Sequence, residues 1–206
     1  MVNQGDTSLA WQERGWLQPD SALPCPSPNH DARPDGAVVS LLVIHNISLP
    51  PLEFGGPYIK QLFTNTLDCS AHPWFENVRG LNVSAHFLIQ RQGELTQFVS
   101  TDDRAWHAGL SCWQGQPRCN DFSIGIELEG ADTEPFTPAQ YQRLAQLIPL
   151  LRAHYPLSAV QGHEHIAPGR KTDPGPFFDW RHPLLLRACT GLILPDPIVS
   201  PPSTGQ

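Results

Sequence analysis

Two histidines and one aspartate, far apart in the chain, carry side chains that could hold a metal ion. His45 ends an apolar segment, His163 follows a short β-type segment, and Asp173 lies in a loop rich in proline and glycine. Two imidazoles and one carboxylate are the protein ligands of a common catalytic zinc site, which leaves a fourth position for water. Zinc in such a site lowers the pKa of its water to about 7 and polarises a carbonyl group. These residue types therefore predict a hydrolytic zinc centre.

A second ligand set is also consistent with the residues alone. His163 and His165 are two positions apart, so on a strand they would share a face and could bind a metal together without Asp173. Glu164 would then point away from the metal. Residue types and spacing leave both ligand sets open.

The loop at residues 167–176 presents a cation beside the candidate carboxylate. Five of its ten residues are proline or glycine. Because the residue before a proline is pushed toward an extended conformation, we expect Asp173 to be extended before Pro174. Lys171 and Asp173, two residues apart, then point to the same side. A stiff loop with this pair of charges is typical of a functional site and not of a spacer.

Several β-type segments must position these side chains. The expected strands are 38–45, 85–90, 95–99, 123–129 and 158–162, with the second and third joined as a hairpin. In the segment 123–129, Ile124 and Ile126 share one face, and Glu127 shares the other face with Gly125. The glycine leaves room beside Glu127 for a substrate or a neighbouring side chain.

The clearest helical segment runs from residue 137 to 155. It begins with a threonine, a proline and a glutamine in the positions of an N-cap, a first helical residue and a capping box. Pro149 is expected to kink this helix or end it early. Shorter helices are expected near residues 56–57 and over 180–189. Strands interleaved with helices predict an α/β (α+β) fold with a central mixed sheet flanked by helices, and long proline-rich loops around the site.

Composition and charge exclude several classes of function. The 206 residues include 20 acidic and 13 basic side chains, a formal net charge of −7, and only two lysines, Lys60 and Lys171. This balance argues against nucleic acid as a partner and against a basic membrane-binding surface. Apolar segments fall far short of the roughly 20 residues that a bilayer span requires.

The cysteines and the N-terminal residues predict a cytoplasmic location. Five scattered cysteines without a CxxC pair suit a reducing compartment, and the first residues lack the basic and apolar regions of a signal peptide. We expect a single domain over residues 1–193, a proline-rich C-terminal tail over 194–206, and a monomer.

Five longer motifs occur in order along the chain. They are LLVIHNISLPP at 41–51, AHFLI at 85–89, RAWHAG at 104–109, CNDFSIGIELEG at 119–130 and GHEHIAPGRKTDPGP at 162–176. Together they resemble the zinc-dependent N-acetylmuramoyl-L-alanine amidase family, over a match that extends from about residue 16 to 180. Within that family the resemblance is strongest to the enzymes that act on 1,6-anhydro-muropeptides in cell-wall recycling.

The resemblance implies a complete set of site residues. It implies one Zn²⁺ per chain, with His45, His163 and Asp173 as ligands in place of the pair that includes His165. It also implies Glu127 as the general base and Lys171 as the group that stabilises the oxyanion. A positioned base contributes about 10²–10⁴-fold to the rate, and one oxyanion donor about 10²–10³-fold. The implied reaction is hydrolysis of the amide between the lactyl group of 1,6-anhydro-N-acetylmuramic acid and L-alanine, in small soluble muropeptides of peptidoglycan recycling.

One residue departs from the related amidases of the phage-lysozyme type. Those enzymes carry a catalytic tyrosine directly before the histidine of the AHF-like segment, whereas this chain has Ala85 before His86. Because the tyrosine is missing, Glu127 is the residue expected to take its catalytic role. We interpret His86 as a buried structural histidine.

Contacts to the substrate are expected from three residues and one long connection. Asn46 is expected to hydrogen-bond the peptide or acetamido group, Trp106 to stack on a sugar, and Arg118 to pair with a muropeptide carboxylate. The proline-rich connection 48–83 is expected to cover the substrate and to favour small muropeptides over the polymeric wall.

Alternative functions remain open at this stage. They are an exported amidase that acts on polymeric peptidoglycan, a non-catalytic peptidoglycan-recognition module, and an unrelated hydrolase that binds metal through His163 and His165. The presence of all three ligand types opposes the recognition module.

Overall fold

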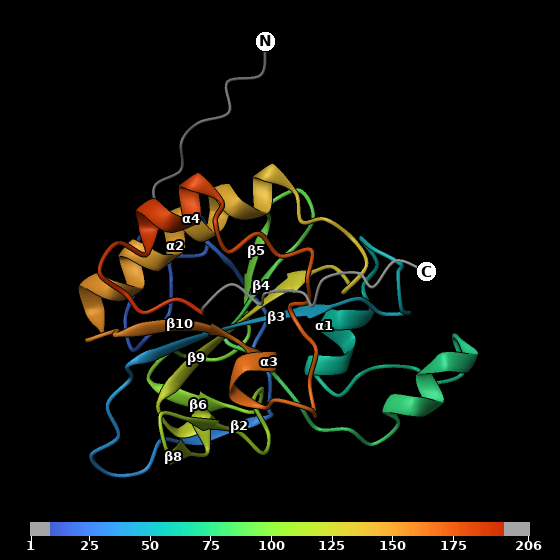
Figure 1. The fold of residues 1–206 in the computed structure, drawn as a ribbon. Helices are drawn as coiled ribbons and strands as arrows, with labels where there is room; N and C mark the ends of the chain where they lie inside the picture. The colour runs from blue at the N-terminus through green and yellow to red at the C-terminus, as the bar shows by residue number, and fades with distance from the viewer. Residues whose placement is uncertain (1–8, 196–206) are drawn as a thin grey trace, which may run out of the picture.

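A six-stranded mixed sheet forms the centre of the computed structural model, which describes residues 9–195 (Figure 1). In spatial order its strands are β1 (Leu23–Pro24), β5 (Leu95–Gln97), β4 (Phe87–Ile89), β9 (Ser123–Glu129), β3 (Leu41–Ile47) and β10 (Ala159–Gly162). β4 and β5 form the expected antiparallel hairpin, whereas β4, β9, β3 and β10 run parallel to one another. The predicted central mixed sheet flanked by helices is confirmed. All but the first two residues of the expected tail lie outside the described range.

Two small sheets and several helices complete the architecture. β2 (His30–Ala32) pairs with β6 (Asp103–Ala105), and β7 (Cys112–Trp113) pairs with β8 (Gln116–Pro117). The helices are α1 (Tyr58–Phe63), α2 (Pro138–His154), α3 (His163–Ile166) and α4 (Pro183–Ala188), with 3-10 turns η1 (Pro73–Val78) and η2 (Cys119–Asp121). Within the described residues, none of these helices is long and apolar enough to cross a bilayer.

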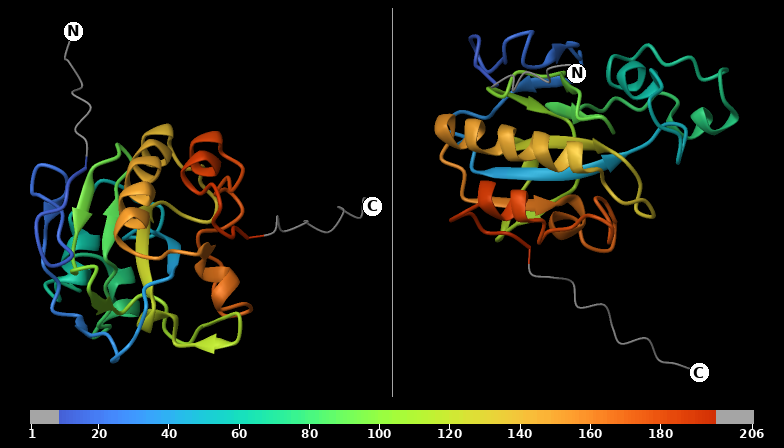
Figure 2. Two further views of the ribbon diagram at one scale, coloured as in Figure 1. Left: turned by 90° about the vertical axis from the view of Figure 1, so that its left-hand side faces the viewer. Right: turned by 90° about the horizontal axis from the view of Figure 1, so that it is seen from above.

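The helices α2 and α4 cover one face of the sheet (Figures 1 and 2). Fully buried aliphatic side chains face them from the two central strands: Leu42 and Ile44 of β3, and Ile124, Ile126 and Leu128 of β9. Because successive side chains of a strand point to opposite faces, His45 and Glu127 must lie on the face turned away from α2. The apolar alternation of two strands therefore decides on which side of the sheet the site lies.

The start of α2 confirms the expected capping box. Thr137 Oγ1 accepts a hydrogen bond from the Gln140 amide at 3.2 Å, and Gln140 Oε1 accepts one from the Thr137 amide at 3.0 Å. Of the two expected effects of Pro149, early termination does not occur, because the helix continues to His154, and a kink stays a prediction. Ile148 and Leu151 are fully buried on either side of the proline, so packing on the sheet compensates for the lost backbone hydrogen bond.

The connection 48–83 forms a lobe beside the sheet, coloured teal to green in Figure 1. It contains α1, where a short helix was expected, and the turn η1. Buried side chains on these turns, such as Ile59, Phe63 and Phe75, pack on Leu88 and Phe98 of the β4–β5 hairpin region. The connection is therefore folded against the β4–β5 hairpin region instead of extending into solvent.

Candidate active site

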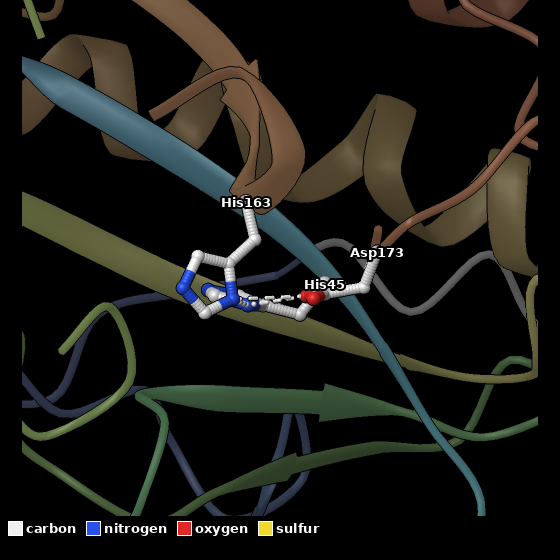
Figure 3. Close-up of side chains that lie close together, drawn as sticks. All are labelled: His45, His163 and Asp173. Atoms are coloured by element: carbon white, nitrogen blue, oxygen red, sulfur yellow. Dashed lines mark hydrogen bonds and ion pairs between the residues drawn. The ribbon is translucent and has the colours of Figure 1, made fainter. Parts of the chain in front are cut away.

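Two parallel strands bring His45 and His163 to the same edge of the sheet. In the pairing of β3 with β10, Ile44 is opposite Gly162, so the next residues of the two strands are His45 and His163. The loop after α3 then returns and places Asp173 against both rings (Figure 3). His45 and His163, 118 positions apart, thus meet because of strand register, and the loop adds Asp173, 10 positions after His163.

The three side chains converge on a small space, as Figure 3 shows. The Nδ1 atoms of His45 and His163 are 3.0 Å apart, and Asp173 Oδ2 lies 2.9 Å from the first and 3.1 Å from the second. Both histidines are buried, with 2% of their surface exposed. The cluster is the predicted set His45, His163 and Asp173, and its geometry is compatible with a metal ion.

The chemistry of the donor atoms fits a cation among them. His163 Nε2 lies 3.0 Å from the carbonyl oxygen of Ala108, which can only accept, so a hydrogen on Nε2 would be bonded there and would leave the Nδ1 lone pair for a metal. Burial lowers the pKa of His45 to about 4, so this ring is neutral. Burial alone would raise the pKa of Asp173, but hydrogen bonds from His163 and His45 outweigh it and hold the pKa well below its usual range. Two neutral imidazoles and a carboxylate are the states in which these groups ligate a metal.

His165 does not join this cluster. The interpretation that pairs it with His163 assumes an extended segment, but residues 163–166 form the helical turn α3, and on a helix positions i and i+2 do not share a face. His165 Nδ1 accepts a hydrogen bond from the Gly162 amide at 3.2 Å, and its ring packs edge-on against Trp180. The rival ligand set is therefore not assembled in the described structure.

Glu127 lies beside His45 on the neighbouring strand. The two residues are directly opposite in the pairing of β3 with β9, and the Glu127 side chain is 8% exposed. Among the described residues, no polar group is within hydrogen-bonding distance of its buried Oε2 atom. Burial, and secondarily the charge of Asp173, raise the pKa of Glu127 well above its ordinary value, whereas Lys171 acts in the opposite direction. A buried carboxyl group with an unused oxygen is typical of a residue that transfers protons.

Lys171 is exposed and lines the same cavity as Glu127 and the metal-ligand cluster. Its loop is tied to α3 by two backbone hydrogen bonds, from the Lys171 amide to Ala167 and from the Glu164 amide to the carbonyl of Asp173. Asp173 precedes a cis peptide bond to Pro174, and its extended conformation stays a prediction. The loop thus brings a cation and a carboxylate to one cavity, as its composition predicts.

The cavity has a volume of about 230 Å³, with a polar end and an apolar wall. The polar end contains His45, Glu127, His163, Lys171 and Asp173. The lobe 48–83 supplies most of the apolar wall, through Leu49, Leu62, Phe63, Trp74, Val78, Leu81 and Val83. An amide bond at the polar end would therefore have the rest of its molecule against this lobe.

Two of the three residues expected to contact the substrate line the cavity, and the third does not. Asn46 lines the cavity, and its Nδ2 donates to Asp132 Oδ1 at 2.6 Å and to the carbonyl of Pro174 at 3.0 Å, which leaves its Oδ1 for a ligand. Trp106 also lines the cavity, with its indole nitrogen donating to Asp31. Arg118 is not among the lining residues within the described range, and its exposed side chain pairs with Asp121 at 3.1 Å. The contact of Arg118 with substrate stays a prediction.

Sequence reasoning missed two residues of the cavity. His107 lies in the RAWHAG motif, but nothing in the motif shows that its Nδ1 lies 2.9 Å from Nε2 of His45. Trp74 lies on η1 and lines the apolar wall. Trp74 could have been found as an aromatic residue within a proline-rich connection. No feature of the sequence shows where the ring of His107 points.

Comparison with known proteins places this geometry in a family. The family model described as N-acetylmuramoyl-L-alanine amidase matches residues 35–176, which include all five residues of the polar end. The chain belongs to the N-acetylmuramoyl-L-alanine amidase family. The predicted enzyme class, an amidase, is confirmed by this membership.

Individual relatives of the amidase agree with this assignment. The chain is 59% identical over 170 residues to the 1,6-anhydro-N-acetylmuramyl-L-alanine amidase AmpD of Escherichia coli, which covers 82% of this chain and 92% of that protein. It is similar to a crystal structure of AmpD with a TM-score of 0.80 and 54% identity, over 86% of this chain and 98% of the other. It also matches the amidase AmiD of E. coli, solved with the substrate anhydro-N-acetylmuramic acid-L-Ala-D-γ-Glu-L-Lys, with a TM-score of 0.54 and 28% identity, over 88% and 65% of the two chains.

Proposed function

We propose that this amidase hydrolyses the amide between the lactyl group of 1,6-anhydro-N-acetylmuramic acid and L-alanine, in soluble muropeptides of peptidoglycan recycling. The observation that carries the proposal is the convergence of two imidazoles, a carboxylate, Glu127 and Lys171 at the end of one cavity. The relatives named for this reaction are similar to the chain over most of their length, which supports the choice of substrate.

The metal we propose is zinc, held by His45, His163 and Asp173. Two nitrogen donors and one carboxylate oxygen suit zinc better than they suit calcium or magnesium, which prefer oxygen ligands. A bound zinc ion would supply Lewis acidity, which polarises the amide carbonyl and makes water more acidic. The chain itself supplies two buried imidazoles, of which His45 is neutral, and the ionised carboxylate of Asp173.

Glu127 and Lys171 have separate roles in the proposed reaction. Glu127 takes a proton from the attacking water, whose oxygen bonds to the carbonyl carbon. The same carboxyl group then gives the proton to the alanine nitrogen as the C–N bond breaks. Lys171 places its ammonium near the carbonyl oxygen, where negative charge develops. The raised pKa of Glu127 favours the first transfer, because it makes the carboxylate a stronger base toward the attacking water.

The lobe 48–83 is proposed to select small muropeptides. Its apolar side chains close one side of a cavity of about 230 Å³, a size that suits part of a small molecule and not a crosslinked polymer. Trp74 and Trp106 offer aromatic faces on which a sugar ring can stack.

One experiment tests the function directly. Purified protein is analysed for bound zinc and incubated with a single anhydro-muropeptide, with products identified by mass spectrometry. We expect about one zinc per chain, release of the free peptide with an N-terminal L-alanine, and loss of turnover on chelation. Faster cleavage of intact sacculi than of the soluble muropeptide would favour a wall-remodelling amidase, and absence of any cleavage would favour a recognition module.

We also propose that the protein acts in the cytoplasm as a monomer. All five cysteines lie among the described residues, are free, and include the buried Cys119 and Cys189, which suits a reducing compartment. Cell fractionation and sedimentation of the purified protein test the two statements.

A further inference from the structure

Two consecutive residues hold the outer nitrogens of both imidazole ligands. His45 Nε2 lies 2.9 Å from Nδ1 of His107, and His163 Nε2 lies 3.0 Å from the carbonyl oxygen of Ala108. These are the nitrogens that do not face Asp173. One short segment after β6 therefore contacts each imidazole ligand on the side away from the proposed metal.

A metal ion on His45 Nδ1, together with these contacts, would determine where the protons lie. A neutral His45 that ligates through Nδ1 must carry its hydrogen on Nε2, and this N–H points at Nδ1 of His107. His107 must then accept with Nδ1 and carry its own hydrogen on Nε2. That nitrogen lies 3.2 Å from Ser123 Oγ, which can accept the bond. The three side chains form a hydrogen-bonded series with one direction, from His45 through His107 to Ser123.

We propose that His107 is a positioning residue, whose Nδ1 accepts a hydrogen bond from His45 and thereby fixes the ring orientation and tautomer in which His45 offers Nδ1 to zinc. Groups that accept from the outer nitrogen of a histidine ligand typically change metal affinity by 10–100-fold when they are removed. An imidazole in this place is a more selective acceptor than a carbonyl oxygen, because it accepts only in one of its two neutral tautomers. The inference rests on the zinc site of the proposed function.

The surroundings of His107 hold it rigidly enough for this role. Asn120 Oδ1 accepts from the backbone amides of both His107, at 3.2 Å, and Ala108, at 2.8 Å. On the other side the imidazole packs on strand β9 at Gly125, where an added Cβ would lie 2.5 Å from the ring. The expected space beside Glu127 is thus filled by a neighbouring side chain. Because the ring is 9% exposed and confined on both sides, His45 meets an acceptor whose position is set in advance.

The test compares two variants that differ in the acceptor. His107→Asn keeps an acceptor, since its Oδ1 can occupy the place of the imidazole Nδ1, whereas His107→Leu has a side chain of similar size without one. Zinc dissociation constants are measured by competition with a chromophoric chelator. We expect His107→Leu to bind zinc 10–100-fold more weakly than the unmodified protein, and His107→Asn to remain within about threefold of it.

A control separates positioning from general stability. His182 stacks on Tyr141 at 4.0 Å between ring centroids and is remote from the metal-ligand cluster in its contacts. His182→Leu is expected to lower the melting temperature without changing zinc affinity. Equal zinc affinity of His107→Leu and the unmodified protein would overturn the inference. So would a loss in His107→Asn as large as that in His107→Leu, because the acceptor would then not be the cause.

A measurement on the unmodified protein covers the case in which His107→Leu does not fold. Long-range ¹H–¹⁵N spectra of the zinc-loaded protein report the tautomer of each histidine. We expect the hydrogen of both His45 and His107 on Nε2. A hydrogen on Nδ1 of His107 would contradict the inference while leaving the zinc site intact. Protein that binds no zinc at all would instead overturn the proposed function, and the inference with it.

Discussion

The buried carboxyl group of Glu127 has an oxygen to which no group in the described structure donates, and it lies beside the cluster of His45, His163 and Asp173. In water such a group would be hydrated, and burying it without a partner costs stability, so its retention is best explained by its chemistry. Glu127→Gln keeps the shape of the side chain but cannot accept a proton. We expect kcat to fall about 10²–10⁴-fold with zinc content unchanged. An equal loss of zinc would show that Glu127 acts through the metal site and not in proton transfer.

Lys171 is expected to contribute charge and not structure. Its side chain is exposed and lines the cavity, so its removal leaves no buried void. Lys171→Ala should lower kcat about 10²–10³-fold, the usual effect of losing one oxyanion donor, with little change in melting temperature. Steady-state kinetics and thermal unfolding measure both effects. A change confined to KM would assign the lysine to substrate binding instead.

His165 distinguishes between the two ligand sets that the sequence leaves open. In the structure its ring contacts Trp180 and the Gly162 amide, outside the metal-ligand cluster. His165→Ala should therefore retain about one zinc per chain and lose some stability from the vacated contact with Trp180. Metal analysis of this variant beside His163→Ala, which should lose its zinc, makes the comparison. Loss of zinc from both variants would instead support His163 and His165 as the metal ligands.

At the scale of elements, the strands were predictable because apolar and β-branched segments are local features. The expected segment 123–129 corresponds to β9 without change, and 38–45 overlaps β3, which starts and ends a few residues later. His45 is therefore inside its strand and not at its end. The pairing of β3 with β10 could not be derived in the same way, because strand order depends on contacts between residues far apart in the chain. The ligand set was accordingly implied by a resemblance and not by spacing.

Loops explain what the sequence analysis missed. His163 and His165 were treated as extended, but the segment turns into α3 directly after β10. The direction of the His107 ring depends on the single glycine opposite it on β9 and on Asn120 from η2, neither of which is local to it. Irregular segments are positioned by such tertiary contacts, and hydrophobic periodicity carries no information about them.

The lobe 48–83 is the element to which we assign substrate selection. Trp74, on η1, is 36% exposed and lines the cavity, so its indole is available for stacking. Trp74→Ala should raise KM for a soluble anhydro-muropeptide about fivefold with a smaller effect on kcat, because one stacking contact contributes on the order of 1 kcal/mol. Kinetics on the muropeptide and on intact sacculi measure the selectivity. If the ratio of the activities on the two substrates did not change, the lobe would not be the element that selects the substrate.

At the scale of the whole molecule, the metal-ligand cluster joins the strands β3 and β10 to the loop after α3. A ligand that binds only the folded state stabilises it by RT ln(1 + [L]/Kd), about 4 kcal/mol at a thousandfold excess over Kd. Removal of zinc by a chelator should therefore lower the melting temperature by several degrees, and added zinc should reverse the change. Differential scanning calorimetry measures this. Asp173→Ala is the matched control, since its melting temperature should no longer respond to the chelator.

A second global property follows from two acids buried in the layer of α2 and α4. Burial raises the pKa of Tyr141 to about 12 from its ordinary value of about 10, and it raises the pKa of the Cys189 thiol to about 11 from about 9. Both groups keep their protons to higher pH in the folded chain than in the unfolded one. Their contribution to stability is therefore complete below about pH 9 and is lost as the pH rises through 9–12.

Urea unfolding of the reduced protein between pH 7 and pH 10.5 tests this alkaline loss. The midpoint should be steady to about pH 9 and then fall. Cys189→Ala removes the group that titrates first, so its midpoint should be lower at pH 7, because the buried side chain is smaller, but should decline less steeply between pH 9 and pH 10.5. Parallel curves for the two proteins would mean that the thiol titrates alike in the folded and unfolded states. Burial of Cys189 in the apolar layer of α2 and α4 would then not be the cause of the lower stability at alkaline pH. This is the layer that leaves His45 and Glu127 on the opposite face of the sheet.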